Sequence, residues 1–262
     1  MTVQVLVSTM YQKDFSLLDR MNIQTDTIVI NQCDKNSQET FQFKNNTITW
    51  ICTEERGVGK SRNRAIIASS ADILLFADDD VVYDDGAIDK VDNYFMSNKD
   101  VSLCTFNIQS LNPERPEIIV RSDYRLHFWN CLKFGASRIA VRRADLLKNN
   151  VFFSLLFGGG AYYQFGEDNH FIMNCLQRSM KCKASSIFLG TVAQDSSTWF
   201  KGYDKKYYQD RGALFYSMFG GKTLFVLLLF EIKHMDNRFF YKIKNEIEGM
   251  HNYKKTTKYC HD

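Results

Sequence analysis

The sequence predicts an α/β fold: a mostly parallel central sheet flanked by helices, with a helical extension at the C-terminal end. Short apolar runs rich in β-branched residues recur early in the chain, at residues 3–7, 27–30, 47–51 and 73–76. Such runs are typical of parallel strands that are buried on both faces. The segments between them are long enough for crossover helices, and this alternation indicates a parallel sheet.

The composition is that of a globular protein with a sizeable core. The chain has 262 residues, of which 45% are hydrophobic and 24% are charged. These values lie close to globular averages and exclude a disordered, collagenous or coiled-coil chain. The net charge of +3 is too small to indicate nucleic-acid binding, so we expect no nucleic-acid partner.

Helices are expected between and after these strands. Residues 15–21 and 61–70 are the candidates in the first part of the chain, and Ser61 is placed to cap the second of them. Both prolines lie in the turn-rich stretch 111–116, which we interpret as a subdomain boundary. The remaining expected elements are strands at residues 101–108 and 138–142, a helix from Asp145 and a helix over residues 167–180.

The C-terminal stretch differs from the rest in charge and hydropathy. Residues 201–262 carry 12 Lys or Arg and 7 Asp or Glu, a net charge of +5, against −2 for residues 1–200. Residues 224–230 are all apolar, but a transmembrane helix needs about 20 apolar residues, so we expect no span. Two interpretations stay open: a helix buried against the α/β domain, or a basic, aromatic-rich element on an anionic membrane surface.

The cysteines indicate a reducing compartment. There are seven of them, an odd number, and no two are spaced as CxxC. Neither a disulfide framework nor a zinc site is therefore supported, and buried free thiols are typical of intracellular proteins. No signal-peptide pattern precedes the first predicted strand, and we expect a cytoplasmic protein.

Three consecutive carboxylates, Asp78, Asp79 and Asp80, follow the apolar run at residues 73–77. Ligands of α/β sheets bind at the carboxyl ends of strands, which is where this triplet is expected to lie. The three charges repel one another, and a divalent cation such as Mg²⁺ or Mn²⁺, which prefers oxygen ligands, would relieve the repulsion. The alternative, a solvated acidic turn, is disfavoured because apolar sequence resumes at Val81.

Two further stretches have residue types that suit chemistry. Residues 54–64 place two glycines, a lysine and arginines at the start of a predicted helix, a set that can bind an anion or form a basic face in solvent. Residues 158–160 are glycines, and Glu167 and Asp168 follow Gly166 at the start of the next predicted helix. The pair either caps that helix or supplies a general base, exposed beside a flexible glycine loop.

Together these signals resemble the family 2 glycosyltransferases of the GT-A fold, and more narrowly the bacterial enzymes that build surface or capsular polysaccharides. The resemblance covers residues 3–200. It implies an inverting enzyme that moves a sugar from a nucleotide-sugar donor, a UDP-sugar, to a hydroxyl of a glycan or lipid-linked glycan acceptor. The residues that carry it are Arg56-Gly57, Ser61-Arg62-Asn63, Asp78-Asp79-Asp80, Gly166-Glu167-Asp168 and Ser197-Thr198-Trp199.

The resemblance also implies roles for individual residues. Asp80, together with Asp78, would hold Mn²⁺ or Mg²⁺ on the diphosphate, and Asp168 would take the proton of the acceptor hydroxyl. Glu167 and Trp199 would face the acceptor, where the indole could stack on a sugar ring. The implied nucleotide-binding residues are Ser8, Thr9, Asn31, Asp34, Arg56, Ser61, Arg62, Asp78 and Asp79.

By the same resemblance the chain divides into three parts. Residues 1–110 would be the nucleotide-sugar-binding half, residues 111–200 the half with the acceptor site and the base, and residues 201–262 a basic, aromatic-rich helical extension. Acceptors of such enzymes are often carried on a membrane lipid. The expected partners therefore include the cytoplasmic face of a membrane, as a peripheral contact, and further copies of the chain in a homo-oligomer.

Two features depart from the family pattern. The loop after the first strand, residues 8–11, reads Ser-Thr-Met-Tyr where a Pro-x-Tyr-Asn-like sequence is usual. Residues 192–196 contain no histidine, although many relatives carry a metal-ligating one there, so Gln194, Asp195 or water would complete the ligand set. The alternatives are a nucleotide-sugar-binding protein that has lost catalysis, and a metal-dependent nucleotidyltransferase.

Overall fold

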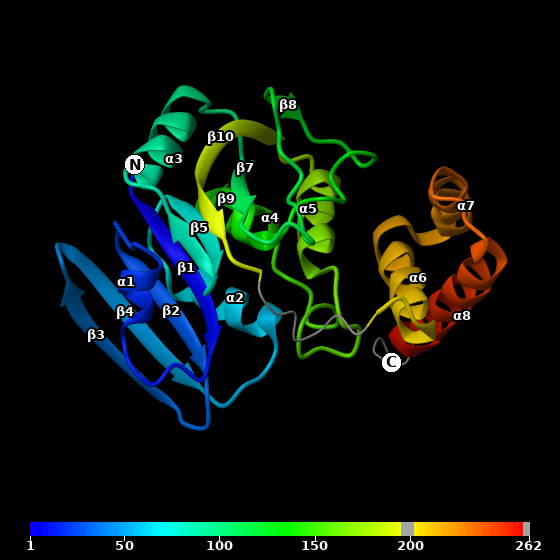
Figure 1. Cartoon of the computed structure of the whole chain (residues 1–262), viewed down its shortest axis with the longest axis horizontal. Helices are drawn as coiled ribbons and strands as arrows, with labels where there is room; N and C mark the ends of the chain where they lie inside the picture. Colours follow the sequence, from blue (N-terminus) through cyan, green and yellow to red (C-terminus); the bar gives the residue numbers. More distant parts are fainter. Residues whose placement is uncertain (195–201, 259–262) are drawn as a thin grey trace.

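The computed structural model describes residues 1–194 and 202–258 and confirms the predicted α/β architecture. Its described residues contain a ten-stranded sheet with the order β3-β4-β2-β1-β5-β9-β7-β10-β6, and β8 pairs with β10 off this path (Figure 1). The strands are β1 (Val3–Met10), β2 (Thr27–Gln32), β3 (Ser37–Phe43), β4 (Asn46–Thr53), β5 (Ile73–Asp78), β6 (Val81–Tyr83), β7 (Leu103–Ser110), β8 (Tyr124–Arg125), β9 (Ile139–Arg142) and β10 (Cys182–Val192).

The first half of the sheet is parallel. Strand β1 pairs with β2 and β5, and β2 pairs with β4, all in parallel register. Strand β9 then inserts antiparallel between β5 and β7, and β7 pairs parallel with β10. The carboxyl ends of β1, β2, β4 and β5 therefore meet at one edge of the sheet, where polar loops follow each strand.

Helices cover both faces of the sheet. Side chains of β1 alternate between two core clusters: Leu6 packs toward α2, α4 and α5, and Val5 and Val7 pack toward α1 and α3. This period of two is what a strand buried on both faces requires. The helices are α1 (Leu17–Arg20), α2 (Val58–Ala68), α3 (Ala87–Ser97), α4 (Arg143–Asn149), α5 (Glu167–Gln177), α6 (Lys205–Phe219), α7 (Thr223–Lys233) and α8 (Phe239–Lys258), with 3₁₀ turns η1 (Ala136–Arg138) and η2 (Gly220–Lys222).

One predicted helix boundary was wrong. Helix α2 begins at Val58, with Gly57 as its N-cap residue at φ +122°, so Ser61 lies inside the helix and does not cap it. The buried Ser61 hydroxyl instead donates to the Ser8 hydroxyl at the end of β1, over 2.9 Å. The glycine at position 57 allows the chain to enter the helix at a positive φ, a conformation that is unfavourable for residues with a side chain.

The C-terminal helices form a unit that packs on α5. Helices α6 and α8 cross closely at two glycines: a side chain at Gly212 would meet the Glu246 carbonyl, and one at Gly249 would meet the Gln209 carbonyl. Leu214 on α6 belongs to the core cluster shared with α5, and Gln177 donates to the Met218 carbonyl over 2.7 Å. The predicted buried packing is thus found on the inner face of this unit.

One helical stretch within the described residues, Lys205–Lys233, is long and apolar enough to cross a membrane by length and composition alone, and most of it is not buried. It is not a straight helix, because η2 separates α6 from α7 at Gly220, whose φ is +53°. Helix α7 alone has 11 residues, about 16 Å at 1.5 Å per residue, which is short of a bilayer core.

Candidate active site

The acidic triplet lies at the carboxyl edge of the sheet, as predicted, but its three carboxylates point to different partners. Asp79 accepts a hydrogen bond from the Thr9 hydroxyl at the end of β1, over 2.5 Å. The Gln12 amide donates to the same two residues, and its backbone N–H donates to the Asn31 side chain over 3.0 Å. Gln12 thus links Thr9 and Asn31, two residues that were predicted to bind nucleotide, at this edge of the sheet.

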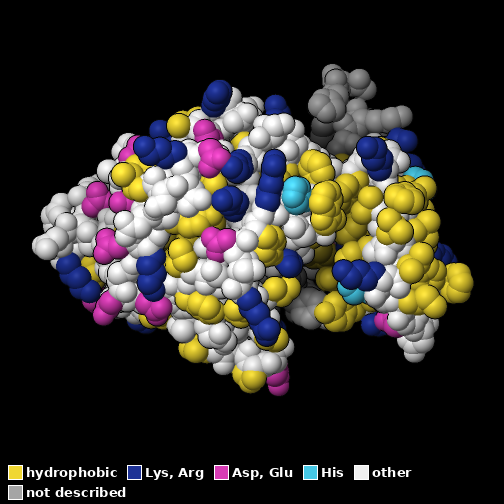
Figure 2. Space-filling view, turned by 90° about the horizontal axis from the view of Figure 1, so that it is seen from above, with side chains coloured by type: hydrophobic (Ala, Val, Ile, Leu, Met, Phe, Trp, Pro, Cys, Tyr) yellow, Lys and Arg dark blue, Asp and Glu magenta, His cyan; other side chains and the backbone are white. Residues whose placement is uncertain are grey.

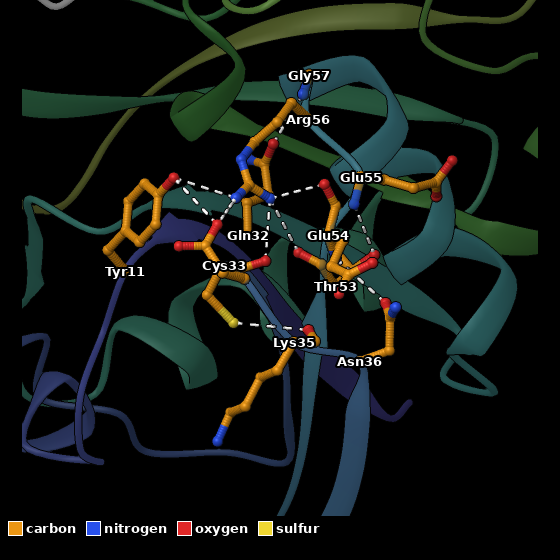
Figure 3. Close-up of polar contacts among 11 residues, drawn as sticks. Tyr11, Gln32, Cys33, Lys35, Asn36, Thr53, Glu54, Glu55, Arg56 and Gly57 are labelled. Atoms are coloured by element: carbon orange, nitrogen blue, oxygen red, sulfur yellow. Dashed lines mark hydrogen bonds and ion pairs between the residues drawn. The ribbon is translucent and has the colours of Figure 1, made fainter.

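Arg56 organises the other end of this edge (Figure 3). One guanidinium nitrogen donates to the backbone carbonyls of Cys33, Thr53 and Glu54. The other donates to the Tyr11 hydroxyl over 3.1 Å and to Asp34 over 2.6 Å, and the guanidinium lies 5.2 Å from the Tyr11 ring centroid. Arg56 and Asp34 are therefore brought together as predicted, beside an aromatic ring that is half exposed.

Arg62 is buried and links the acidic triplet to Glu167, the neighbour of the predicted base Asp168. It donates to Asp78 over 2.8 Å and to Glu167 over 2.7 Å, with only 4% of its side chain exposed. Burial opposes the charge of the guanidinium, but the two carboxylates outweigh this and raise the pKa of Arg62. Its Nε has no hydrogen-bond partner among the described residues, which leaves one buried donor for a ligand.

Asp80 is the member of the triplet whose carboxylate is bonded to no other side chain within the described residues. It is partly buried. Within the described residues its backbone carbonyl accepts from the Ala193 N–H, and its side chain accepts from the Gln194 backbone N–H, each over 3.3 Å. Burial and the charges of Asp78 and Asp79 raise the pKa of Asp80. A divalent cation fits a carboxylate whose charge is disfavoured in this way.

The described residues contain no preformed cluster of three His, Cys, Asp or Glu side chains that would hold a metal. The Gln194 amide, expected to replace the missing histidine, donates to Glu117 over 2.6 Å and is turned to that partner. Asp195 and the predicted acceptor residue Trp199, with the Ser197-Thr198 pair, lie outside the described residues.

Asp168 lies in the first turn of α5, next to Glu167. One of its carboxylate oxygens accepts from the Asn169 backbone N–H over 2.6 Å, and a side chain added at Gly135 would lie 4.0 Å from the other. It is partly buried and not exposed, contrary to the sequence prediction, because the segment at Gly135 lies against it. Burial first, and then the charges of Glu167 and Asp78, raise the pKa of Asp168 to about 7, which suits a general base at neutral pH.

The glycine loop before Asp168 is held in place by α2, which the prediction of a flexible loop did not include. The Val58 backbone N–H donates to the Gly159 carbonyl over 2.9 Å. A side chain at Gly160 would come within 3.0 Å of the Gly57 Cα, and one at Gly158 within 2.8 Å of Glu167. The glycines therefore permit close approach of two backbones and fix the start of α5 against the start of α2.

We expect the pH dependence of the reaction to report Asp168. A base works when deprotonated, so the rate should fall as the pH drops below about 7. Glu167→Gln removes a neighbouring negative charge and releases Arg62 to interact with Asp168, and both effects lower the pKa of Asp168. The acidic limb of a kcat profile should therefore move to lower pH in Glu167→Gln and stay in place in the control Glu55→Gln, whose carboxylate is exposed. An unmoved limb in Glu167→Gln would contradict this electrostatic coupling.

Sequence reasoning missed two glutamine side chains of the site, Gln12 and Gln32. Gln12 joins Thr9, Asn31 and Asp79, and the Gln32 side chain accepts from the Gly57 backbone N–H over 2.8 Å. Neutral amides have no characteristic spacing that marks a site. The one available signal was position, because Gln32 ends β2 in the row of strand ends that the triplet also occupies.

Comparisons with known proteins bear on the fold and on the family. The family model of glycosyl transferase family 2 matches residues 16–130. S. aureus TarS in complex with UDP-GlcNAc superimposes with a TM-score of 0.59 at 14% identity, covering 83% of this chain and 66% of that one. For TarS without a named ligand the TM-score is 0.61 at 12% identity, covering 98% of this chain and 92% of that one. For the UDP complex of TarS the TM-score is 0.61 at 13% identity, covering 91% of this chain and 73% of that one. No curated protein matches in sequence.

These similarities show the GT-A glycosyltransferase fold, which confirms the fold predicted from the sequence. The predicted recognition is confirmed as well, because the family model matches residues 16–130, which include the acidic triplet. Asp168 and the C-terminal helices lie outside the matched segment, so their roles depend on the geometry of this chain.

Proposed function

We propose that this protein is an inverting glycosyltransferase that uses a UDP-sugar donor and a glycan or lipid-linked glycan acceptor in surface polysaccharide synthesis. The observation that carries the proposal is the buried Arg62, which ties Asp78 of the triplet to Glu167, the neighbour of Asp168. Donor-binding and acceptor-activating groups thus belong to one electrostatic cluster.

The nucleotide would lie along the carboxyl edge of the sheet. The Tyr11 ring and the Arg56–Asp34 pair offer a stacking face and a hydrogen-bonding edge for the base. Asn31, Ser8 and Thr9 line the adjacent strand ends near the expected ribose, and Ser61 supports Ser8 from α2. Two of the similar TarS structures are complexes with UDP-GlcNAc and with UDP, which supports a uridine nucleotide here.

The diphosphate would lie at Asp78 and Asp80. These two carboxylates would hold Mn²⁺ or Mg²⁺, which, when bound, neutralises the charge that develops on the departing diphosphate. Arg62 keeps Asp78 in position and offers its free Nε at the same place. Thr9 and Gln12 hold the Asp79 side chain on the opposite side.

Asp168 would take the proton from the acceptor hydroxyl as that oxygen attacks the anomeric carbon from the face opposite the diphosphate. The Asn169 N–H fixes one carboxylate oxygen and leaves the other free to accept the proton. Glu167, held by Arg62, keeps the pKa of Asp168 raised. Trp199 remains our proposed acceptor contact on sequence grounds.

The test is nucleotide release from a panel of UDP- and GDP-sugars, with Mn²⁺, with Mg²⁺ and with EDTA. We expect release from a UDP-sugar that depends on the metal, and Asp80→Ala should abolish the stimulation by metal. Asp85→Ala, an exposed carboxylate beyond the triplet, serves as the control. Equal release in EDTA would overturn the metal assignment, and release from GDP-sugars alone would overturn the donor assignment.

A further inference from the structure

Helix α7 packs one face against the described residues and leaves an apolar face uncovered. Its inner face buries Thr223, Leu227 and Glu231, spaced four residues apart. The outer face exposes a second apolar row, which we call the α7 stripe. The α7 stripe consists of Leu224 (46% exposed), Phe225 (67%), Leu228 (44%), Leu229 (53%) and Ile232 (58%).

The α7 stripe continues beyond the helix and forms one patch. Met235, Phe240 and Tyr241 follow it into the start of α8 and are also exposed. Figure 2 shows hydrophobic side chains gathered over the C-terminal helices, with Lys and Arg side chains among them. A continuous apolar patch of this kind on a soluble surface indicates an interaction site.

The exposed charges around the α7 stripe are mostly basic. Lys222 and Lys233 stand at the two ends of α7, and Lys244 follows on α8, all exposed. Two acidic residues of the same region, Glu231 and Glu246, are fully buried on Arg211, and a third, Asp236, is exposed but paired with Lys242 over 2.9 Å. The α7 stripe is therefore flanked by a mainly basic rim of exposed side chains.

We propose that the α7 stripe docks on an anionic lipid surface, with α7 lying parallel to the membrane and its basic rim on the headgroups. The combination of an apolar helix face with basic residues beside it is the pattern of interfacial helices. Contact with a second copy through the same stripe would bring Lys222, Lys233 and Lys244 of both copies together, and the exposed acidic residue of this segment, Asp236, is already paired with Lys242. That repulsion is why we choose a lipid over a homodimer.

The first test is co-sedimentation of the full chain with vesicles. At low salt we expect binding to vesicles of phosphatidylcholine with phosphatidylglycerol, at least tenfold weaker binding to phosphatidylcholine alone, and release from the anionic vesicles at high salt. The assay needs no sugar transfer, so it is independent of the proposed function. A protein that stays in the supernatant with anionic vesicles at low salt overturns the proposal.

Two pairs of variants separate the contributions of charge and apolar contact. Lys233→Glu with Lys244→Glu should weaken binding to anionic vesicles at least tenfold, whereas the control Lys99→Glu with Lys148→Glu, of equal net charge, should not. Phe225→Ser should weaken it several-fold, and Ile67→Ser, at an equally exposed position on α2, should not. A stable dimer in solution that Phe225→Ser dissociates would overturn the proposal in favour of a self-contact.

Discussion

Asp168→Asn should lower the rate of transfer by about 100-fold or more, the usual scale for loss of a general base. The substitution keeps the side-chain shape and an oxygen for the Asn169 N–H, but it removes the basic carboxylate. The affinity for UDP should stay close to that of the unchanged protein, because Asp168 lies on α5 and not on the strand ends that would hold the nucleotide. The measurements are kcat and a UDP titration on the same preparation.

The control for this prediction is Asp89→Asn, which removes a carboxylate from the first turn of another helix, α3. It should leave both quantities unchanged. Near-normal turnover in Asp168→Asn would exclude Asp168 as the base and make Glu167 the next candidate.

Arg62→Met should destabilise the protein by about 3 kcal/mol, at the lower end for removal of one partner from a buried ion pair. Methionine fills similar volume but leaves Asp78 and Glu167 without their cation. Glu167 is 13% exposed and carries most of the penalty, and Asp78, at 41%, is partly solvated. The free energy of unfolding from urea denaturation measures the effect.

Lys60→Met is the matched control on the same helix. Its ion pair with Glu55 is exposed and spans 3.7 Å, and such pairs contribute less than about 1 kcal/mol. A loss in Arg62→Met no larger than in Lys60→Met would show that the two carboxylates are solvated without Arg62.

The parallel half of the fold and the acidic triplet could be predicted because local sequence dictates both. Buried parallel strands need unbroken apolar runs, so the run at residues 73–77 marks β5 and places Asp78 at its carboxyl end. The charge of the following residues then indicates a cation. Nothing from elsewhere in the chain is needed for either step.

The remaining elements depend on partners far away in the sequence. Strand β10 begins Cys-Lys-Ala-Ser-Ser and has register shifts against β7 between Ala184 and Gly190, so its pattern is neither continuous nor alternating. Edge strand β3 is mostly exposed and gains its structure from pairing with β4. Arg62 links Asp78 to Glu167, although Arg62 and Glu167 lie 105 positions apart in the sequence. No short sequence motif can predict that contact.

The backbone contact between the glycine loop, residues 158–160, and the start of α2 limits how this site can change during evolution. It consists of backbone against backbone, with Val58 donating to Gly159 and no room for a side chain at Gly59 beside the Ser154 carbonyl. We therefore expect substitutions in the surrounding side chains to leave unchanged the distance from the proposed base, Asp168, to the proposed donor site. An insertion in the loop would shift that separation directly, and side chains at Gly158 or Gly160 would force the two backbones apart, so we expect the loop to tolerate neither kind of change.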